Sequence, residues 1–211
     1  IVDPPDGRVP PMTAEAVARV AATPRRDTSG RSGADGPEDL SLFVRCITRG
    51  VPGMMMPSIY NNGLQIVQGP GHVAIQKEMI HETRVIPTEP KPALGDALTS
   101  WLGTTQGRWE GDTLVVETGN FLRETSFRAG SADAKLRLTE RFTRVSEGTL
   151  MYEATIDDPS VWARPWTYQV PMVLNDQPVF EYACHEGNYG LYNILAGARV
   201  AEAASEREGQ P

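Results

Sequence analysis

The feature that most constrains the fold is an alternation of apolar and polar residues that recurs between Leu64 and His185. A period of two is typical of strands that bury one face. Turn sequences such as Gly69-Pro70-Gly71 separate the alternating runs. The pattern predicts strands over residues 64–68, 72–79, 83–87, 107–109, 113–118, 136–145, 149–156, 166–173 and 179–185.

A succession of about eight antiparallel strands without long helices between them must protect its sheet edges, and closure into a barrel does so most completely. We therefore predict a mainly β fold, an up-and-down, lipocalin-like barrel. Residues 1–37 are expected to form an N-terminal arm with a short helix, ahead of a single domain over residues 38–211. Helical spacing returns at 188–206, which predicts a C-terminal helix packed on the outside of the sheet.

The charge balance limits the classes of partner. The chain has 20 basic and 27 acidic residues, a net charge of −7, and no basic cluster, which disfavours nucleic acid and anionic membranes as partners. No apolar run approaches the roughly 20 residues that a membrane-spanning helix needs. The chain begins at Ile1, which we interpret as the result of processing or trimming.

The two cysteines, Cys46 and Cys184, are far apart, and neither belongs to a CxxC pair. This spacing excludes a zinc site with four thiolates. A disulfide and two unrelated buried thiols remain as alternatives. We favour the disulfide, which suits an exported protein in an oxidising periplasmic or extracellular space.

Several sequence blocks resemble a large family of exported bacterial hypothetical proteins, over a region from about Asp3 to Arg199. The blocks are RCITRG (45–50), YNN (60–62), QIVQ (65–68), EMIH (78–81), GRWEGDTLVVET (107–118), ERFTRV (140–145) and YACHEGNYG (182–190). The resemblance implies an exported location and carries no activity or catalytic residue with it.

Two residues form the preferred candidate dyad. If the strand that begins at His72 runs on to His81, then His81 shares the buried face with Met79. The same alternation places Glu186 on one face with Tyr182. A buried carboxylate has a raised pKa unless a cation meets it, and an imidazole is a suitable cation. We therefore predict that Glu186 orients His81, which moves a proton near neutral pH.

Other side chains complete this hypothetical site. Tyr60 is a candidate donor to a developing oxyanion, with Asn61 or Asn188 as a second donor, although all three suit ordinary turns. His185 is either a surface residue or a further catalytic group beside Gly187. The candidate substrate-binding residues are Asn61, Asn188, Trp166, Tyr182, Met79 and Arg141. For Arg141, a strand residue paired with a carboxylate such as Glu153 is the alternative interpretation.

The favoured function is an exported small-molecule enzyme, a lyase, isomerase or hydrolase, that uses acid/base chemistry without a metal or cofactor in a barrel cavity. One alternative is a non-enzymatic, lipocalin-like binder of an apolar small molecule. Another is a metal-dependent enzyme with His81, His185 and Glu186 as ligands, although no HxH or HExxH spacing supports it. A structural protein of the cell envelope stays open as a further class.

Overall fold

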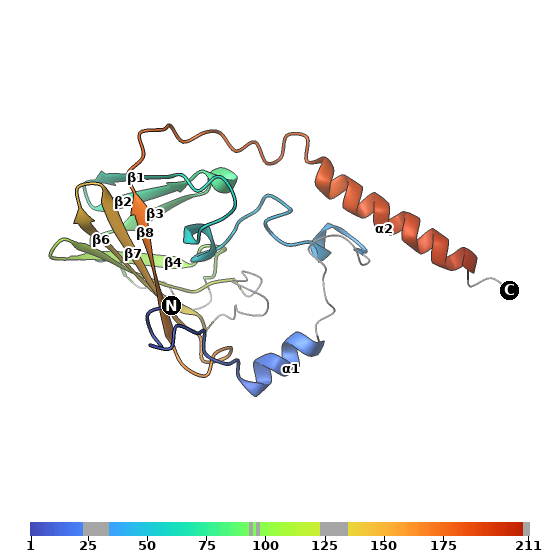
Figure 1. Cartoon of the computed structure of the whole chain (residues 1–211), viewed down its shortest axis with the longest axis horizontal. Helices are drawn as coiled ribbons and strands as arrows, with labels where there is room; N and C mark the ends of the chain where they lie inside the picture. Colours follow the sequence, from blue (N-terminus) through green and yellow to red (C-terminus); the bar gives the residue numbers. More distant parts are fainter. Residues whose placement is uncertain (23–33, 93–94, 96–97, 123–134, 209–211) are drawn as a thin grey trace.

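The strands form two antiparallel sheets in the computed structural model, which describes residues 1–22, 34–92, 95, 98–122 and 135–208. In each sheet the strands are neighbours in chain order (Figure 1). The small sheet consists of β1 (Leu64–Gly69), β2 (His72–Lys77) and β3 (Thr83–Pro87). The large sheet consists of β4 (Thr104–Glu110), β5 (Thr113–Gly119), β6 (Arg137–Ser146), β7 (Thr149–Asp157) and β8 (Trp166–Val173). The predicted mainly β, antiparallel fold is confirmed.

The lipocalin-like barrel is not confirmed. Within the described residues, no backbone ladder joins β3 to β4 or β8 to β1. The N-terminal arm meets the free edge of β8 only at the start of the strand, where Asp3 bridges to Thr167; its second bridge, from Met12 to Trp162, precedes β8.

The core lies between the two sheets. Alternate residues of β2 and β7 point inward, such as Val73 and Ile75 of β2 and Tyr152 and Ile156 of β7, and all four are buried. The polar partners of this alternation point outward, as the sequence pattern predicts. The shared core therefore fixes which face of the small sheet points inward and which points outward.

A buried ion pair joins the two sheets inside this core. Arg84 of β3 donates from Nη1 to Glu140 Oε1 of β6 at 3.0 Å and from Nη2 to Thr118 Oγ1 at 2.9 Å. Tyr152 donates its hydroxyl to the same Glu140 oxygen at 2.9 Å. The exposed fractions of Arg84 and Glu140 are only 2% and 0%. Burial alone would lower the pKa of Arg84, but the Glu140 carboxylate holds it above its usual value.

The predicted C-terminal helix is confirmed as α2 (Tyr189–Glu208). Asn188 caps it, since the backbone N–H of Leu191 donates to Asn188 Oδ1 at 3.1 Å. The helix lies away from both sheets (Figure 1), and Arg199 donates to the carbonyl oxygens of Ala34 and Asp35. The prediction that this helix packs on the outside of the sheet is therefore wrong.

The remaining helices are short. The N-terminal arm contains α1 (Ala14–Ala22), where the Thr13 hydroxyl accepts from the N–H of Ala16. Part of the predicted arm, residues 23–33, lies outside the described residues. The described residues also form 3₁₀ helices at Pro37–Asp39, Gly53–Met55 and Met79–His81. Among the described helices, none combines the length and apolar character needed to cross a bilayer.

Candidate functional site

The chain turns sharply between β2 and β3, and this turn decides where His81 lies. Strand β2 ends at Lys77, and the following residues form the 3₁₀ helix that ends at His81. Ile80 and His81 have φ angles of 61° and 45°, in the left-handed region that a β-branched residue rarely adopts. The alternation therefore does not continue through the turn. His81 is exposed, so the prediction that it lies on the buried face is wrong.

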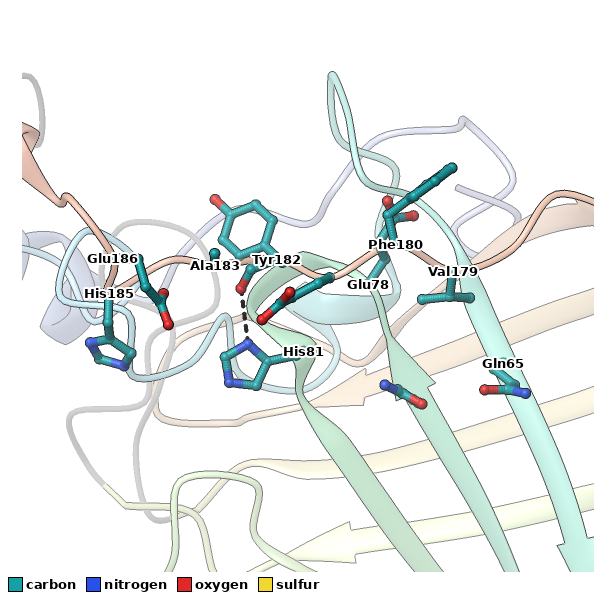
Figure 2. A pocket seen from close by; sticks show the side chains of 11 residues that line it. Gln65, Glu78, His81, Val179, Phe180, Tyr182, Ala183, His185 and Glu186 are labelled. Atoms are coloured by element: carbon teal, nitrogen blue, oxygen red, sulfur yellow. Dashed lines mark hydrogen bonds between the residues drawn. The ribbon is translucent and has the colours of Figure 1, made fainter.

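His81 lines a polar cavity of about 530 Å³, here called the outer pocket. The pocket lies between the outer face of the small sheet and residues 174–188, the crossing segment, which runs from β8 to α2 (Figures 1 and 2). Its lining residues are Gln65, Gln76, Glu78, His81, Val179, Phe180, Glu181, Tyr182, Ala183, His185 and Glu186. The structure thus brings together four predicted site residues: His81, His185, Glu186 and Tyr182.

The imidazole of His81 is held in one orientation. Its Nδ1 lies 3.0 Å from the carbonyl oxygen of Tyr182 (Figure 2). A carbonyl oxygen can only accept, so Nδ1 carries the hydrogen, and in the neutral ring Nε2 is left as the proton acceptor. This arrangement gives His81 the tautomer that a general base needs.

His185 and Glu186 lie on the same side of the crossing segment as His81 (Figure 2). The expected strand over residues 179–185 is not formed, and the segment turns at Gly187, whose φ is 64°. Glu186 is therefore exposed to solvent, and the prediction of a desolvated carboxylate is wrong. Within the described part of the chain, no three histidine, cysteine or carboxylate side chains are grouped so that they could hold a metal ion.

The predicted donors Tyr60 and Asn61 act around the outer pocket but do not line it. Asn61 donates from Nδ2 to Glu78 Oε1 at 2.7 Å, and the N–H of Gly63 donates to the other Glu78 oxygen. Burial and then the hydrogen bond with Tyr60 raise the pKa of Tyr182. These contacts hold the loop that carries Tyr60 and Asn61 against the pocket.

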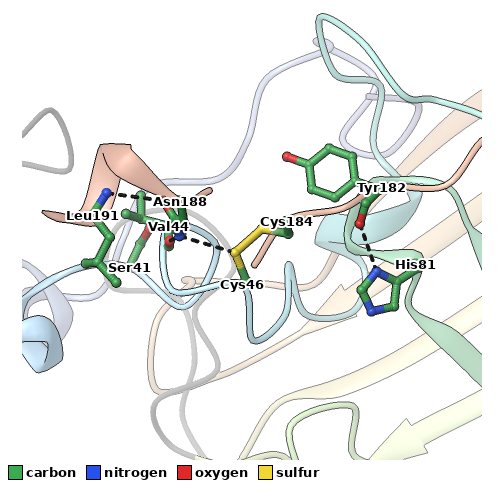
Figure 3. The surroundings of a disulfide bond; sticks show 8 residues. All are labelled: Ser41, Val44, Cys46, His81, Tyr182, Cys184, Asn188 and Leu191. Carbon is green, nitrogen blue, oxygen red and sulfur yellow. Dashed lines mark hydrogen bonds between the residues drawn. A yellow bond between two sulfur atoms is a disulfide. The ribbon is translucent and has the colours of Figure 1, made fainter. Parts of the chain in front are cut away.

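The predicted disulfide is confirmed, with the two sulfur atoms of Cys46 and Cys184 2.07 Å apart (Figure 3). The bond fastens the crossing segment next to Tyr182 and His185. Asn188 donates from Nδ2 to the carbonyl oxygen of Val44 at 3.1 Å, and its Oδ1 accepts from the first turn of α2. Its side-chain amide therefore links the start of α2 to the segment that carries Cys46. Asn188 does not line the outer pocket, where it was expected as a second oxyanion donor.

Three further predicted residues lie elsewhere. Met79 and Trp166 are core residues with exposed fractions of 1% and 0%. Arg141 forms an ion pair with Glu110 at 3.1 Å, although its cross-strand neighbour is Glu153. None of these three residues lines the outer pocket or the cavities described next.

An apolar cavity of about 640 Å³, here called the inner cleft, opens between β1 and β8. Its wall consists mostly of aliphatic and methionine side chains. The lining residues are Met55, Met56, Pro57, Asn62, Leu64, Ile66, Lys77, Arg144, Glu147, Gly148, Thr149, Leu150, Val170, Pro171, Met172, Val173, Leu174, Asn175 and Gln177. A second hollow of about 490 Å³ near Trp109 shares Ile66, Arg144 and Leu150 with it, so the apolar opening extends along the inter-sheet space.

Lys77 is the functional candidate that the sequence analysis missed. It follows Val73 and Ile75 on the inner face of β2, and its exposed fraction is 2%. Burial, and then the nearby charge of Arg49, lower its pKa from 10.5 to about 8, while Glu78 acts in the opposite direction. The signal was present in the sequence, because a lysine in register with an apolar face is a buried lysine.

The chain matches no protein-family model, no curated protein and no solved structure. The resemblance to exported bacterial hypothetical proteins therefore stays a prediction, and any functional argument must come from the cavities themselves.

Proposed function

We propose that the protein binds a small, largely apolar molecule in the inner cleft. The observation that carries this proposal is the cleft itself, a cavity of about 640 Å³ with a mainly apolar wall. Ligand sites typically occupy about 300 to 1,000 Å³ and combine an apolar wall with few polar groups. Met55, Met56 and Met172 add flexible side chains that adapt to ligands of different shape.

The position of the cleft suits entry of a ligand from the side. Closure of a lipocalin-like barrel would require β1 to pair with β8 and β3 to pair with β4, and the cleft occupies the space between β1 and β8. We propose that the two sheets act as an incompletely closed barrel, with the ligand in the opening. A ligand there would cover apolar side chains such as Leu64 and Met172 that otherwise face solvent.

The proposed location is outside the cytoplasm, because the Cys46–Cys184 disulfide suits an oxidising compartment. A net charge of −7 supports a small molecule rather than nucleic acid as the partner.

Two adjacent residues of β1 provide the test. Ile66 lines the inner cleft and Gln65 lines the outer pocket. Titration with N-phenyl-1-naphthylamine, a neutral apolar fluorophore, should give a saturable fluorescence increase. Ile66→Trp fills the cleft and should weaken binding at least tenfold, whereas Gln65→Trp should leave it unchanged. Equal affinities for the two variants would contradict the proposal.

The outer pocket supports a second candidate function, metal-free acid/base chemistry. The specific observation is the hydrogen bond from His81 Nδ1 to the Tyr182 carbonyl oxygen, which leaves Nε2 available as a base. His185 and Glu186 line the same pocket and could assist proton transfer. An exposed site of this kind depends on the substrate to exclude water.

His72 offers a matched control for this second candidate. It lies at the other end of β2, and its Nδ1 also faces a carbonyl oxygen, that of Pro70, at 2.8 Å, but it does not line the outer pocket. With p-nitrophenyl esters as probes, His81→Ala should lower kcat/KM at least a hundredfold and His72→Ala should not. Equal rates for both variants would leave His81 with a structural role alone.

A further inference from the structure

We propose that the ligand of the inner cleft is an amphiphile with one carboxylate, whose head group pairs with the Lys77 ammonium while its tail lies along the apolar wall. This inference rests on the proposed binding function and specifies the ligand's chemistry.

Lys77 is buried, and the part of the chain that the structure describes supplies no bonded counter-ion for it. Its exposed fraction is 2%, and the described residues supply no hydrogen bond or ion pair to its ammonium group. Buried charges in proteins are normally paired, because an isolated charge loses its hydration without compensation. A ligand carboxylate in the cleft that Lys77 lines would provide the missing partner.

Arg84, the other buried cation of the small sheet, differs from Lys77 because it has a counter-ion. Its guanidinium is paired with Glu140 and bonded to Thr118, all within the core. Among the described residues, no carboxylate bonds to Lys77, and Glu82, whose backbone carbonyl accepts from the Lys77 N–H, has its carboxylate bonded to the Thr48 hydroxyl. The nearest acidic residue along the chain, Glu78, is already bonded to Asn61 and to the backbone of Gly63 beside the outer pocket.

The remaining charges around the cleft leave Lys77 as the anchoring cation. Arg49 lies close enough to lower the pKa of Lys77 and adds positive potential. Arg144 lines the cleft, but its guanidinium is bonded to the carbonyl oxygens of Ser146 and Glu147. The Glu147 side chain is exposed in the turn between β6 and β7. A single ammonium suits a singly charged head group.

The rest of the cleft suits an alkyl or similar tail. The side chains that line it away from Lys77 are mainly apolar, and the lining includes Met56, Leu64, Leu150 and Met172. Burying a tail against them is favourable by the hydrophobic effect and is independent of charge. Head and tail therefore make separable contributions to affinity, and each can be removed in turn.

The head-group contact should also depend on pH. Because the pKa of Lys77 is lowered to about 8, the ammonium is mostly charged at pH 7 and mostly neutral at pH 9 in the empty cleft. A bound carboxylate favours the charged form. The affinity for a carboxylate should therefore fall as pH rises above 8, and the affinity for a neutral analogue should not.

The test compares decanoate with 1-decanol, which share a tail and differ in charge, by isothermal titration calorimetry at pH 7. The wild-type protein should bind decanoate at least tenfold more tightly than decanol. Lys77→Met, which keeps the length and removes the charge, should abolish this preference. Lys91→Met, at an exposed lysine outside the cleft, is the matched control and should behave like the wild type.

The outcomes separate the two proposals. If decanol and decanoate bind the wild type equally, or if the Lys77→Met variant keeps the preference, the role of Lys77 is wrong while an apolar cleft remains. If neither compound binds, the apolar binding function itself is contradicted. Circular dichroism of Lys77→Met should match the wild type, so a lost preference is not a loss of fold.

Discussion

The two faces of the small sheet present cavities of similar size and opposite character. The outer pocket is polar, and one of its walls is the crossing segment, held by the Cys46–Cys184 disulfide and by the hydrogen bond of His81. The inner cleft is apolar, is lined largely by strands, and contains one buried ammonium group. The charged side chain of Glu186 in the outer pocket is exposed, and water screens it, whereas the exposed fraction of Lys77 in the inner cleft is 2%. We therefore expect a single charge to contribute more to recognition in the inner cleft.

Removal of the disulfide should have the largest effect of the changes considered, and it tests the difference between the two cavities. The disulfide closes a loop with a sequence separation of 138 residues, and replacing Cys46 and Cys184 by Ser should lower the free energy of unfolding by roughly 4 to 5 kcal/mol through the entropy of the unfolded chain. Urea unfolding measures the loss.

The same double variant should affect the two cavities unequally. While it remains folded, it should lose the fixed His81 tautomer, seen by ¹⁵N NMR of the imidazole, and should keep fluorophore binding in the inner cleft. Loss of fluorophore binding in the folded variant would show that the two cavities are not independent.

Arg84→Met should have the next largest effect. The substitution leaves Glu140 buried without its counter-ion, which typically costs about 3 to 5 kcal/mol of folding free energy. Arg108→Met is the control, because Arg108 pairs with Glu110 and Glu117 on the exposed face, and no measurable change is expected there. Chemical denaturation of both variants makes the comparison, and similar losses would argue against a special role for the buried pair.

Lys77→Met should instead stabilise the protein. The folded state lowers the pKa of Lys77 from 10.5 to about 8, so at pH 7 its ammonium opposes folding. Between about pH 8 and 10.5 the unfolded chain binds more protons at this residue, so its contribution to stability rises with pH.

Urea unfolding at pH 7 and at pH 9.5 tests whether the contribution of Lys77 to stability rises with pH. The wild type should gain stability relative to Lys77→Met as pH rises, because the penalty on its ammonium disappears. A variant less stable than the wild type at pH 7 would mean that the ammonium already has a partner within the protein.

Glu186→Gln should have the smallest effect. Glu186 is exposed on the crossing segment, so the free energy of unfolding should change by no more than about 0.5 kcal/mol. The same unfolding experiment measures it. A large loss would indicate that the outer pocket is less open to solvent than its geometry indicates.

The sequence predicted what depends on local periodicity. Alternation predicted all of the strands that form, and the change to helical spacing at Asn188 predicted α2. The disulfide was the favoured of two alternatives for Cys46 and Cys184, chosen because it suits an exported protein, and it is confirmed. The alternating residues 179–185 did not become a strand, because apolar alternation does not guarantee a neighbouring strand to pair with.

The errors have distinct physical causes. His81 faces outward because the positive φ angles at Ile80 and His81 interrupt the alternation. Neither residue is a glycine, so the sequence does not indicate a turn at this position. The Arg84–Glu140 pair joins residues 56 apart in two different sheets, which no local pattern reveals. Lys77, in contrast, was visible in the pattern of β2, since it continues the apolar face.

The most direct measurement locates the ligand by NMR of protein with ¹³C-labelled methionine methyl groups during addition of decanoate. Three of the seven methionines, Met55, Met56 and Met172, line the inner cleft, whereas Met54 and Met79 are buried and do not line it, so they serve as internal references. Saturable shifts at the three cleft methionines, with Met54 and Met79 unchanged, are the predicted result. Unchanged methionine signals, together with shifts of the His81 and His185 imidazoles in ¹⁵N NMR of a ¹⁵N-labelled sample, would place the ligand in the outer pocket and contradict the account.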